Sequence, residues 1–270
     1  METQYIKLLC KCLQSKTRTT RNATVYSVFG ERLEHDFIHG FPLLTTKKMF
    51  FKGIVEELAW FLRGSTNVEE LKAKGVHIWD KNTEGRNNDA GPVYGFQWRH
   101  FGARYQDSLT KYGGVDQIQR IIDLIKTEPT SRRIFMSAWN PSQQDEMCLP
   151  PCHVSYQFYV HEGRLSCQMY QRSADIFLGL PFNIASTALL LQLIAHECDL
   201  SPGKMILCLG DVHLYHTHVR PALKQIIRKP LPFPFIQLTR DKDGLKEVEL
   251  KEIALLNYES YSALKADMIA

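Results

Sequence analysis

Two strand-like runs joined by a short turn constrain the fold of this 270-residue chain more than any other feature. Residues 153–160 (HVSYQFYV) have the aromatic and β-branched content of a strand, and residues 164–171 predict a second strand. Residues 161–163 (HEG) form the turn between them. Because Cys152 starts the first strand of this hairpin and Arg172 ends the second, we expect the two residues to be cross-strand neighbours.

A cysteine beside an arginine is typical of a nucleophilic site. The thiolate attacks, and an arginine that never loses its charge favours the thiolate. The alternative is a buried structural cysteine after the Pro150–Pro151 turn, and Arg172 makes that alternative weaker. The sequence therefore predicts an enzyme.

The rest of the chain alternates helical and strand-like patterns without a linker or a repeat. Apolar spacing and Gly or Pro boundaries predict helices over residues 5–15, 51–62, 68–74, 115–126, 182–198 and 219–228. Strands are expected over residues 24–29, 134–139 and 205–209, and a surface loop over 81–91. The helix at 182–198 is the most apolar and is expected to be the buried central one. We predict one domain over residues 1–270.

Composition favours a soluble protein of a reducing interior. Hydrophobic residues make up 44% of the chain, and no run reaches the roughly 18 apolar residues of a membrane helix. The N-terminus lacks the pattern of a signal peptide, and seven cysteines form a poor disulfide framework. We expect a cytoplasmic location.

The net charge of +4 does not indicate nucleic-acid binding, because the basic residues are dispersed. A small polyanion explains them as well. Arg21, Arg172 and the pair Arg132–Arg133 are candidates for a phosphate clamp, since guanidinium groups match phosphate oxygens in pairs. For Arg132–Arg133, a solvated pair before the strand at 134–139 is the equal alternative.

Several further segments, in this order, carry a resemblance to the thymidylate synthase family. They are FPLLTTKK (41–48), ELAWFL (57–62), IWD (78–80), GPVYGFQWR (91–99), SRR (131–133), LPPCH (149–153), QRSAD (171–175), LPFN (180–183) and GDVHLY (210–215). The resemblance covers most of the chain. It implies an α/β (α+β) fold: a single domain with a large twisted mixed β-sheet, helices packed on one face and a homodimer interface on the other. Arg132 and Arg133 would then reach the partner subunit's nucleotide phosphate.

The resemblance also implies the reaction. dUMP would be methylated to dTMP by 5,10-methylenetetrahydrofolate, a co-substrate that leaves as dihydrofolate, and no metal is involved. Cys152 would add to uracil carbon 6, which turns carbon 5 into a nucleophile. The expected catalytic set is Cys152, Glu57, Tyr94, Arg172 and Asp175. Glu57 lies in an otherwise apolar helix, so its pKa should be raised, whereas Glu56 fits a solvated face better.

The expected substrate contacts add residues from three segments. Asn183 offers a donor and an acceptor that match uracil and not cytosine, although the alternative is that it caps a helix beginning near Ile184. His213 and Tyr215, two apart on a strand end, would share a face and hold the sugar 3′-hydroxyl. The complete expected set is Arg21, Arg132, Arg133, Arg172, Gln171, Ser173, Asp175, Asn183, His213 and Tyr215.

The residues expected to contact the folate follow from the same resemblance. Ile78, Trp79 and Phe182 would wall the folate ring, and Lys47 would meet its acidic tail. The complete expected set is Lys47, Ile78, Trp79, Asp175, Leu178, Gly179, Phe182 and Ala270, the last belonging to a C-terminal segment that closes over the site.

Two questions stay open at this level. The family's phosphate loop is one residue shorter here, so Arg18 competes with Arg21 for the phosphate. A dUMP hydroxymethylase, in which water traps the methylene group of the same Cys152 adduct, is the alternative function. Only exclusion of water separates the two reactions.

Overall fold

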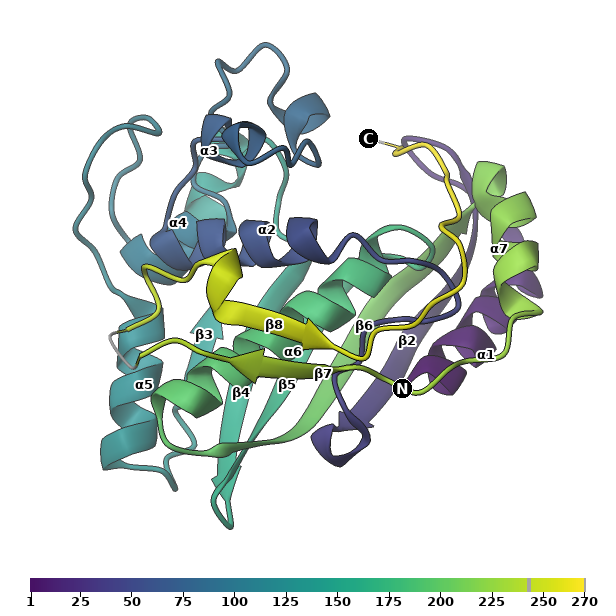
Figure 1. Ribbon diagram of the computed structural model, residues 1–270. Coiled ribbons are helices and arrows are strands. Elements are labelled where there is room, and N and C mark those ends of the chain that lie inside the picture. The colour runs from purple at the N-terminus through teal and green to yellow at the C-terminus, as the bar shows by residue number, and fades with distance from the viewer. Residues whose placement is uncertain (242–243, 270) are drawn as a thin grey trace.

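A six-stranded mixed sheet forms the centre of the computed structural model, which describes residues 1–241 and 244–269 (Figure 1). The strands lie in the order β1-β2-β6-β5-β4-β3. Their bounds are β1 Thr17–Thr19, β2 Thr24–Asp36, β3 Phe135–Ser137, β4 His153–His161, β5 Arg164–Asp175 and β6 Ser201–Tyr215. β5 and β6 run parallel, and every other neighbouring pair in this sheet is antiparallel. The predicted α/β fold with a mixed sheet is confirmed.

The predicted hairpin is the pair β4–β5. His153 is the register partner of Gln171, and the main-chain N–H of Arg172 donates to the carbonyl of Cys152 at 2.9 Å. The register shifts between His153 and Ser155, where the strand contains a bulge. The expected cross-strand adjacency of Cys152 and Arg172 is therefore confirmed.

β2 and β6 are much longer than their sequence patterns predict. They pair from Val25↔Tyr215 to Asp36↔Lys204, and the pairing continues across the glycine-containing stretches that hide the strand signal. Gly210 is needed for close approach of strands, because a Cβ there would lie 2.7 Å from the carbonyl oxygen of Arg172. A strand can thus continue through a glycine where the neighbouring strand leaves no room for a side chain.

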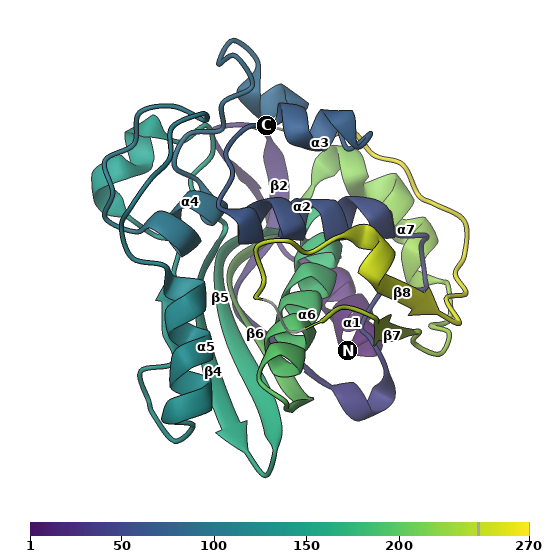
Figure 2. The same cartoon turned by 60° about the vertical axis from the view of Figure 1, so that its left-hand side comes forward.

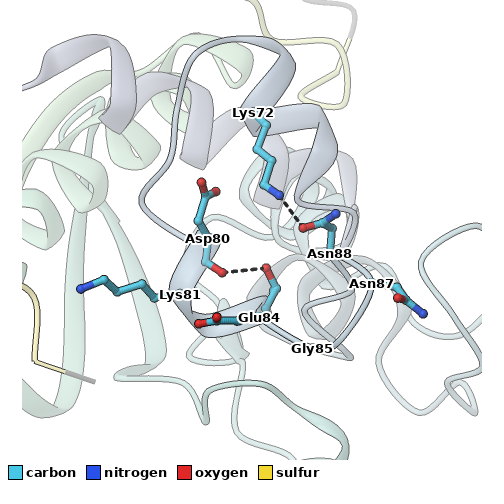
Figure 3. Close-up of a pocket in the computed structure, with 8 residues that line it drawn as sticks. Lys72, Asp80, Lys81, Glu84, Gly85, Asn87 and Asn88 are labelled. Carbon is cyan, nitrogen blue, oxygen red and sulfur yellow. Dashed lines mark hydrogen bonds between the residues drawn. The ribbon is translucent and has the colours of Figure 1, made fainter.

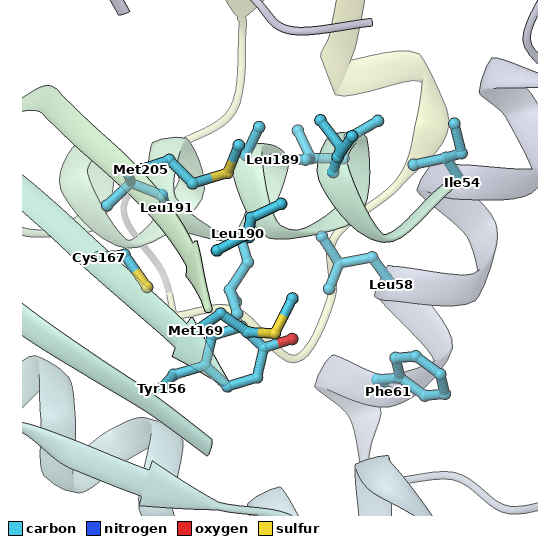
Figure 4. Close-up of a cluster of buried hydrophobic side chains, with 14 of the residues drawn as sticks. Ile54, Leu58, Phe61, Tyr156, Cys167, Met169, Leu189, Leu190, Leu191 and Met205 are labelled. Atoms are coloured by element: carbon cyan, nitrogen blue, oxygen red, sulfur yellow. The ribbon is translucent and has the colours of Figure 1, made fainter. Parts of the chain in front are cut away.

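The apolar helix α6 (Gly179–Glu197) packs on β5 and β6 and fills the core. Its leucines face side chains of α2 (Phe51–Arg63) on one side and of the sheet on the other (Figure 4). By length and composition this helix could cross a membrane, but most of it is buried inside the protein. The helix starts three residues before the predicted Phe182, because Pro181 is tolerated in a first turn.

The other predicted helices are present with small changes at their ends. They are α1 Glu2–Leu13, α3 Glu69–Ala73, α5 Gln117–Thr127 and α7 Val219–Ile226. α1 packs against β2, β6 and α7, and α2 ends at Gly64, whose φ of +78° is the left-handed conformation that glycine adopts freely. The predicted loop at 81–91 begins inside the short 3-10 helix η2 (Asp80–Thr83).

Several parts of the fold have no counterpart in the sequence predictions, among them the short strand β1. α4 (Tyr94–His100) is almost wholly buried and therefore shows no amphipathic period. β7 (Phe235–Leu238) and β8 (Ile253–Leu256) form a separate antiparallel pair. After β8 the chain runs past α7 and approaches the turn between β1 and β2 (Figures 1 and 2).

One face of the sheet carries exposed aromatic side chains. Tyr156 and Met169 are buried on the face that α6 covers, whereas Tyr159 (62% exposed) and Tyr170 (42%) project from the opposite face of the same strands. Phe135 on β3 is 50% exposed and pairs with Gln157, the neighbour of Tyr159 two positions along that face. Phe135, Tyr159 and Tyr170 are therefore large aromatic residues exposed on this face.

Candidate active site

Cys152 and Arg172 meet at the start of β4. The guanidinium of Arg172 donates from Nε to the Pro151 carbonyl and from an Nη to the Pro150 carbonyl, both at 2.8 Å. It also lies over the ring of Trp139, 5.4 Å from the ring centroid. Arg172 thus holds the Pro150–Pro151 turn in place and keeps a positive charge beside the thiol.

The charge of Arg172 does not by itself create a thiolate at Cys152. Burial raises the pKa of this thiol above its usual value, while Arg172 and a hydrogen bond with Tyr94 lower it. The sequence-based expectation that Arg172 favours the thiolate is right in direction, but burial outweighs it.

Tyr94 links the nucleophile to the aromatic core. Its hydroxyl accepts a hydrogen bond from the Cys152 N–H at 2.7 Å, and its ring stacks on His153 at 4.1 Å. Burial raises the pKa of Tyr94 far above that of a free phenol. His153 also contacts the Tyr156 hydroxyl through Nδ1 at 2.9 Å, and burial lowers its pKa to about 3, so its ring is neutral. The hydroxyl group of Tyr94 is therefore held beside Cys152.

Glu57 lies on α2 and accepts a hydrogen bond from Trp79 Nε1 at 2.7 Å. Burial raises its pKa to about 7, and the bond from Trp79 opposes that rise. The predicted shift is thus confirmed in direction, and a carboxyl that titrates near neutral pH suits proton transfer. Glu56 is not on a solvated face, contrary to expectation: it is 5% exposed and pairs with Lys74 Nζ at 2.6 Å.

Glu57→Gln is expected to stabilise the fold at neutral pH while it lowers turnover. Between about pH 4.5 and about pH 7 the folded wild type keeps a proton that the unfolded chain has released, so its stability falls as pH rises through that window. The variant has no such loss, and its advantage should grow by about 2 to 3 kcal/mol across the window. Urea unfolding at a series of pH values measures this. We expect kcat to fall about 100-fold.

Glu56→Gln is the matched control, because it neutralises the neighbouring carboxylate of the same helix and breaks its pair with Lys74. It should lose stability across the whole range. Wild-type and Glu57→Gln curves that stay parallel from pH 4.5 to pH 7 would contradict the buried, raised-pKa carboxyl.

Asn183 is inside α6 and does not cap it, since the helix begins at Gly179 after Leu178. Its Oδ1 accepts a hydrogen bond from Gln171 Nε2 at 2.9 Å, and Gln171 also donates to the Ser173 carbonyl. This bond fixes which end of the Asn183 amide is the acceptor and leaves Nδ2 free to donate to a ligand. The helix-cap alternative is therefore wrong, and Gln171 orients the candidate base-reading group.

His213 and Tyr215 lie together at the end of β6, with perpendicular rings 5.2 Å apart. Burial raises the pKa of Tyr215, and the charges of Asp175, Cys152 and Asp211 act in the same direction while Arg21 opposes them. Charged residues from several segments of the chain therefore lie near the Tyr215 hydroxyl. The candidate site is thus assembled around the carboxyl end of β5 and β6.

Arg18 and Arg21 occupy different positions. Arg18 on β1 forms an ion pair with Asp211, whereas Arg21 is exposed in the turn that leads to β2. His213 Nδ1 lies 3.3 Å from the same carboxylate, Asp211 Oδ1. Because Arg18 already has a carboxylate partner, Arg21 is the better placed of the two to receive a phosphate.

Asp175 ends β5 and shapes the turn into α6. Its Oδ1 accepts hydrogen bonds from the N–H groups of Phe177 (2.9 Å) and Leu178 (3.2 Å). Gly179 leaves room beside it, since a Cβ there would lie 3.7 Å from Asp175 Cβ and 3.9 Å from Asn183 Oδ1. The residues predicted for the folate and for the base are therefore neighbours at this turn.

Lys47 is buried. The expected contact with the acidic tail of the folate suggested a solvated side chain instead. Its ammonium donates to the Phe177 carbonyl and lies 4.0 Å from the centroid of the Phe177 ring. Burial lowers its pKa to about 8, and Asp175 opposes the change. Lys47 thus adds positive charge close to Asp175.

The remaining predicted residues lie at the edges of the site or elsewhere. Trp79 is buried beside Glu57, while Ile78 and Phe182 are partly exposed. Arg132 and Arg133 are exposed in the turn before β3 and contact none of the other predicted residues through a described hydrogen bond or ion pair. Ala270 lies outside the described residues.

Open pockets lie away from Cys152. One of about 420 Å³ lies at η2, with Lys72, Asp80 and Lys81 among its lining residues (Figure 3). Another of about 490 Å³ lies on the outer strand faces near Tyr159 and Lys204. None of the residues that line them belongs to the predicted site. Pocket size alone therefore does not locate the chemistry of this chain.

Sequence reasoning left out three side chains that shape the site. Trp139 faces Arg172, His153 stacks on Tyr94, and Asp211 binds Arg18. Of these three residues, His153 was the one that the sequence could have indicated, because it adjoins Cys152. Trp139 and Asp211 act through contacts between distant segments, which no local pattern reveals.

Comparison with known proteins agrees with this arrangement. A family model described as thymidylate synthase matches residues 3–270. The chain is 48% identical over 276 residues to a thymidylate synthase of Herpesvirus ateles (97% of this chain, 95% of that protein) and 46% identical over 283 residues to the human thymidylate synthase (99% and 90%). It is also 50% identical over 255 residues to bifunctional dihydrofolate reductase-thymidylate synthase 1 of Arabidopsis thaliana, covering 90% of this chain and about half (49%) of that protein. The chain belongs to the thymidylate synthase family.

Proposed function

We propose that this chain is a thymidylate synthase that methylates dUMP to dTMP, with 5,10-methylenetetrahydrofolate supplying the carbon and the hydride. The observation that carries the proposal is the placement of both Arg172 and the Tyr94 hydroxyl next to Cys152 in a member of this family. Residues 1–270 act as one catalytic domain in this proposal. We also propose a soluble, cytoplasmic enzyme, in keeping with its seven free cysteines.

The nucleophilic step uses Cys152 and its two neighbours. Sγ adds to carbon 6 of uracil, and the electrons of the 5,6 double bond move toward carbon 5 and the carbonyl at position 4. A nucleotide phosphate competes for the guanidinium of Arg172, which donates to two proline carbonyls. Carbon 5 then attacks the one-carbon unit, and Tyr94 with Glu57 removes and relays the carbon 5 proton. Loss of that proton expels tetrahydrofolate from the new methylene group. Hydride from tetrahydrofolate then reduces the methylene to methyl as Cys152 leaves carbon 6, which gives dTMP and dihydrofolate.

Asn183 selects the base in this proposal. Gln171 occupies one lone pair of Oδ1, the other accepts from the ring N–H, and Nδ2 donates to the carbonyl at position 4. His213 and Tyr215 hold the sugar hydroxyl, Ser173 lies nearby on β5, and Arg21 binds phosphate.

The folate lies across the β5–α6 turn. Asp175, Leu178 and Gly179 contact its pterin ring, while Ile78, Trp79 and Phe182 form its apolar wall. Lys47 supplies positive charge toward its acidic part. Closure of the C-terminal segment, which includes Ala270, excludes water until hydride transfer is complete.

Two products measured in the same reaction mixture test this function. dUMP tritiated at carbon 5 is supplied with methylenetetrahydrofolate, and tritium release is compared with the formation of dihydrofolate. Equal amounts are expected. Tritium release without dihydrofolate would identify the hydroxymethylase instead, and formation of neither product would remove catalysis on dUMP from consideration.

We further propose a homodimer in which Arg132 and Arg133 bind the partner subunit's nucleotide phosphate. Both side chains are exposed, and they lie at the strand edge next to the face that carries Phe135 and Tyr159. An exposed aromatic face beside two exposed arginines suits a second copy of the chain that holds a phosphate.

Mixing two inactive variants tests the shared site. Cys152→Ser and the double variant Arg132→Ala, Arg133→Ala are each expected to have little activity alone. After subunit exchange at equal concentrations, hybrid dimers carry one complete site, and about a quarter of the wild-type activity should return. A mixture of Cys152→Ser and Glu57→Gln subunits is the control. Cys152 and Glu57 belong to the site of one subunit, so these hybrid dimers carry no complete site and activity should not return. No recovery in the first mixture, with subunit exchange shown by mass, would contradict the shared phosphate site.

A further inference from the structure

A buried histidine connects the C-terminal segment with Asp175. His218 ends η4 (His216–His218), and its side chain is 1% exposed. Its Nε2 lies 2.8 Å from the main-chain oxygen of Asp267. Because a carbonyl oxygen only accepts, Nε2 carries the hydrogen and donates this bond. The tail is therefore attached to a group inside the protein.

The other nitrogen of the same ring faces the active site. Nδ1 lies 3.9 Å from Asp175 Oδ1, and within the described ranges no group forms a hydrogen bond with it. The rings of Tyr215 (centroid distance 5.3 Å) and Phe177 (5.7 Å) pack against the imidazole. This packing restricts rotation of the ring. A change in the contact of Nε2 with the tail therefore also changes the position of Nδ1 relative to Asp175.

The attachment of the tail at Asp267 is separate from its other contacts. The Tyr258 hydroxyl donates to the Leu44 carbonyl at 2.7 Å, and Arg228 binds the Ser262 carbonyl at 2.8 Å. In the described chain beyond Ser262, the bond to His218 is the hydrogen bond that holds the segment. Loss of the bond at Asp267 would thus leave the contacts of Tyr258 and Ser262 in place.

We propose that His218 is a positioning residue that couples docking of the C-terminal segment to the carboxylate of Asp175. The inference rests on the proposed function, in which Asp175 meets the pterin ring. With the segment docked, Nε2 is satisfied and Nδ1 stays directed at Asp175. When the segment leaves, Nε2 loses its acceptor while the packed rings still hold the imidazole, so the position of His218 beside Asp175 becomes less favourable. Folate binding and tail docking then favour each other by the same factor.

The test measures the binding of dihydrofolate to the enzyme–dUMP complex, which undergoes no reaction. His218→Phe keeps an aromatic ring between Tyr215 and Phe177 but removes both nitrogens. It should weaken dihydrofolate about tenfold and leave dUMP affinity unchanged. His218→Gln keeps a donor for the Asp267 carbonyl and should recover part of the loss. His216→Phe, a change at an exposed neighbour, should have no effect.

A double-mutant cycle separates coupling from a structural role. In a chain that ends at Ala266, His218→Phe should no longer weaken dihydrofolate, because the partner of Nε2 is already absent. An equal tenfold loss in the full and the shortened chain, or no loss in either, would overturn the inference while leaving the proposed function standing. If His218→Phe does not fold, the cycle with His218→Gln should show a smaller difference of the same sign, and its absence would again overturn the inference. A wild type that binds dUMP but no folate would overturn the proposed function itself.

Discussion

Replacing Cys152 with serine is expected to lower kcat at least about 10⁴-fold and to leave dUMP binding within about threefold of wild type. A serine hydroxyl beside Tyr94 and Arg172 keeps the hydrogen-bonding shape of the site but cannot supply a thiolate at neutral pH. Tritium release from carbon 5 measures the chemistry, and calorimetry measures the nucleotide affinity.

Cys148→Ser is the matched control for this variant. Cys148 is also partly exposed, precedes the same Pro-Pro turn and, like Cys152, has a thiol pKa that burial raises, here to about 11. Unlike Cys152, it contacts none of the proposed catalytic groups by a described hydrogen bond. It should retain wild-type turnover. A Cys152→Ser enzyme that works near the wild-type rate would eliminate covalent catalysis by this residue.

Asn183→Asp is expected to reverse the base preference. The variant should lose at least about 100-fold in kcat/KM for dUMP, because a carboxylate cannot donate to the carbonyl at position 4. The corresponding cytosine nucleotide presents an amino group there, to which a carboxylate is a good acceptor. We therefore expect methylation of dCMP to become detectable. Gln171 donates to either side chain, so the position of the group should be kept.

Chromatography of the products from each nucleotide, with the folate at saturation, measures this change. Asn87→Asp, which makes the same substitution in an exposed loop, should keep the wild-type preference. If Asn183→Asp still prefers dUMP by the wild-type ratio, Asn183 does not read the base.

The sequence predicts the hairpin of this site because both of its strands and the turn are local signals. Cross-strand pairing then places Cys152 beside Arg172 without further information. By contrast, α4 is buried on nearly every side, so its sequence has no periodic polar face, although it carries Tyr94. Family resemblance locates Tyr94 where the helical pattern does not.

Other features depend on tertiary contacts that no single segment encodes. Glu56 was expected to be solvated, but Lys74 from the next helix neutralises it and permits burial. The direction of the Arg172 guanidinium depends on two proline carbonyls, and the neutral state of His153 depends on the aromatic cluster around Tyr94. The chemical types of these residues could be predicted, whereas their partners could not.

The covalent bond between Cys152 and uracil is the central claim, and a trapped complex tests it most directly. With 5-fluoro-dUMP and methylenetetrahydrofolate, attack by Sγ and addition of the one-carbon unit can proceed, but fluorine cannot leave carbon 5 as a proton does. Intact-mass measurement should show the nucleotide and the folate added together to the chain, and peptide mapping should place them on Cys152. A chain of unchanged mass, or an adduct on another cysteine, would contradict the proposed mechanism.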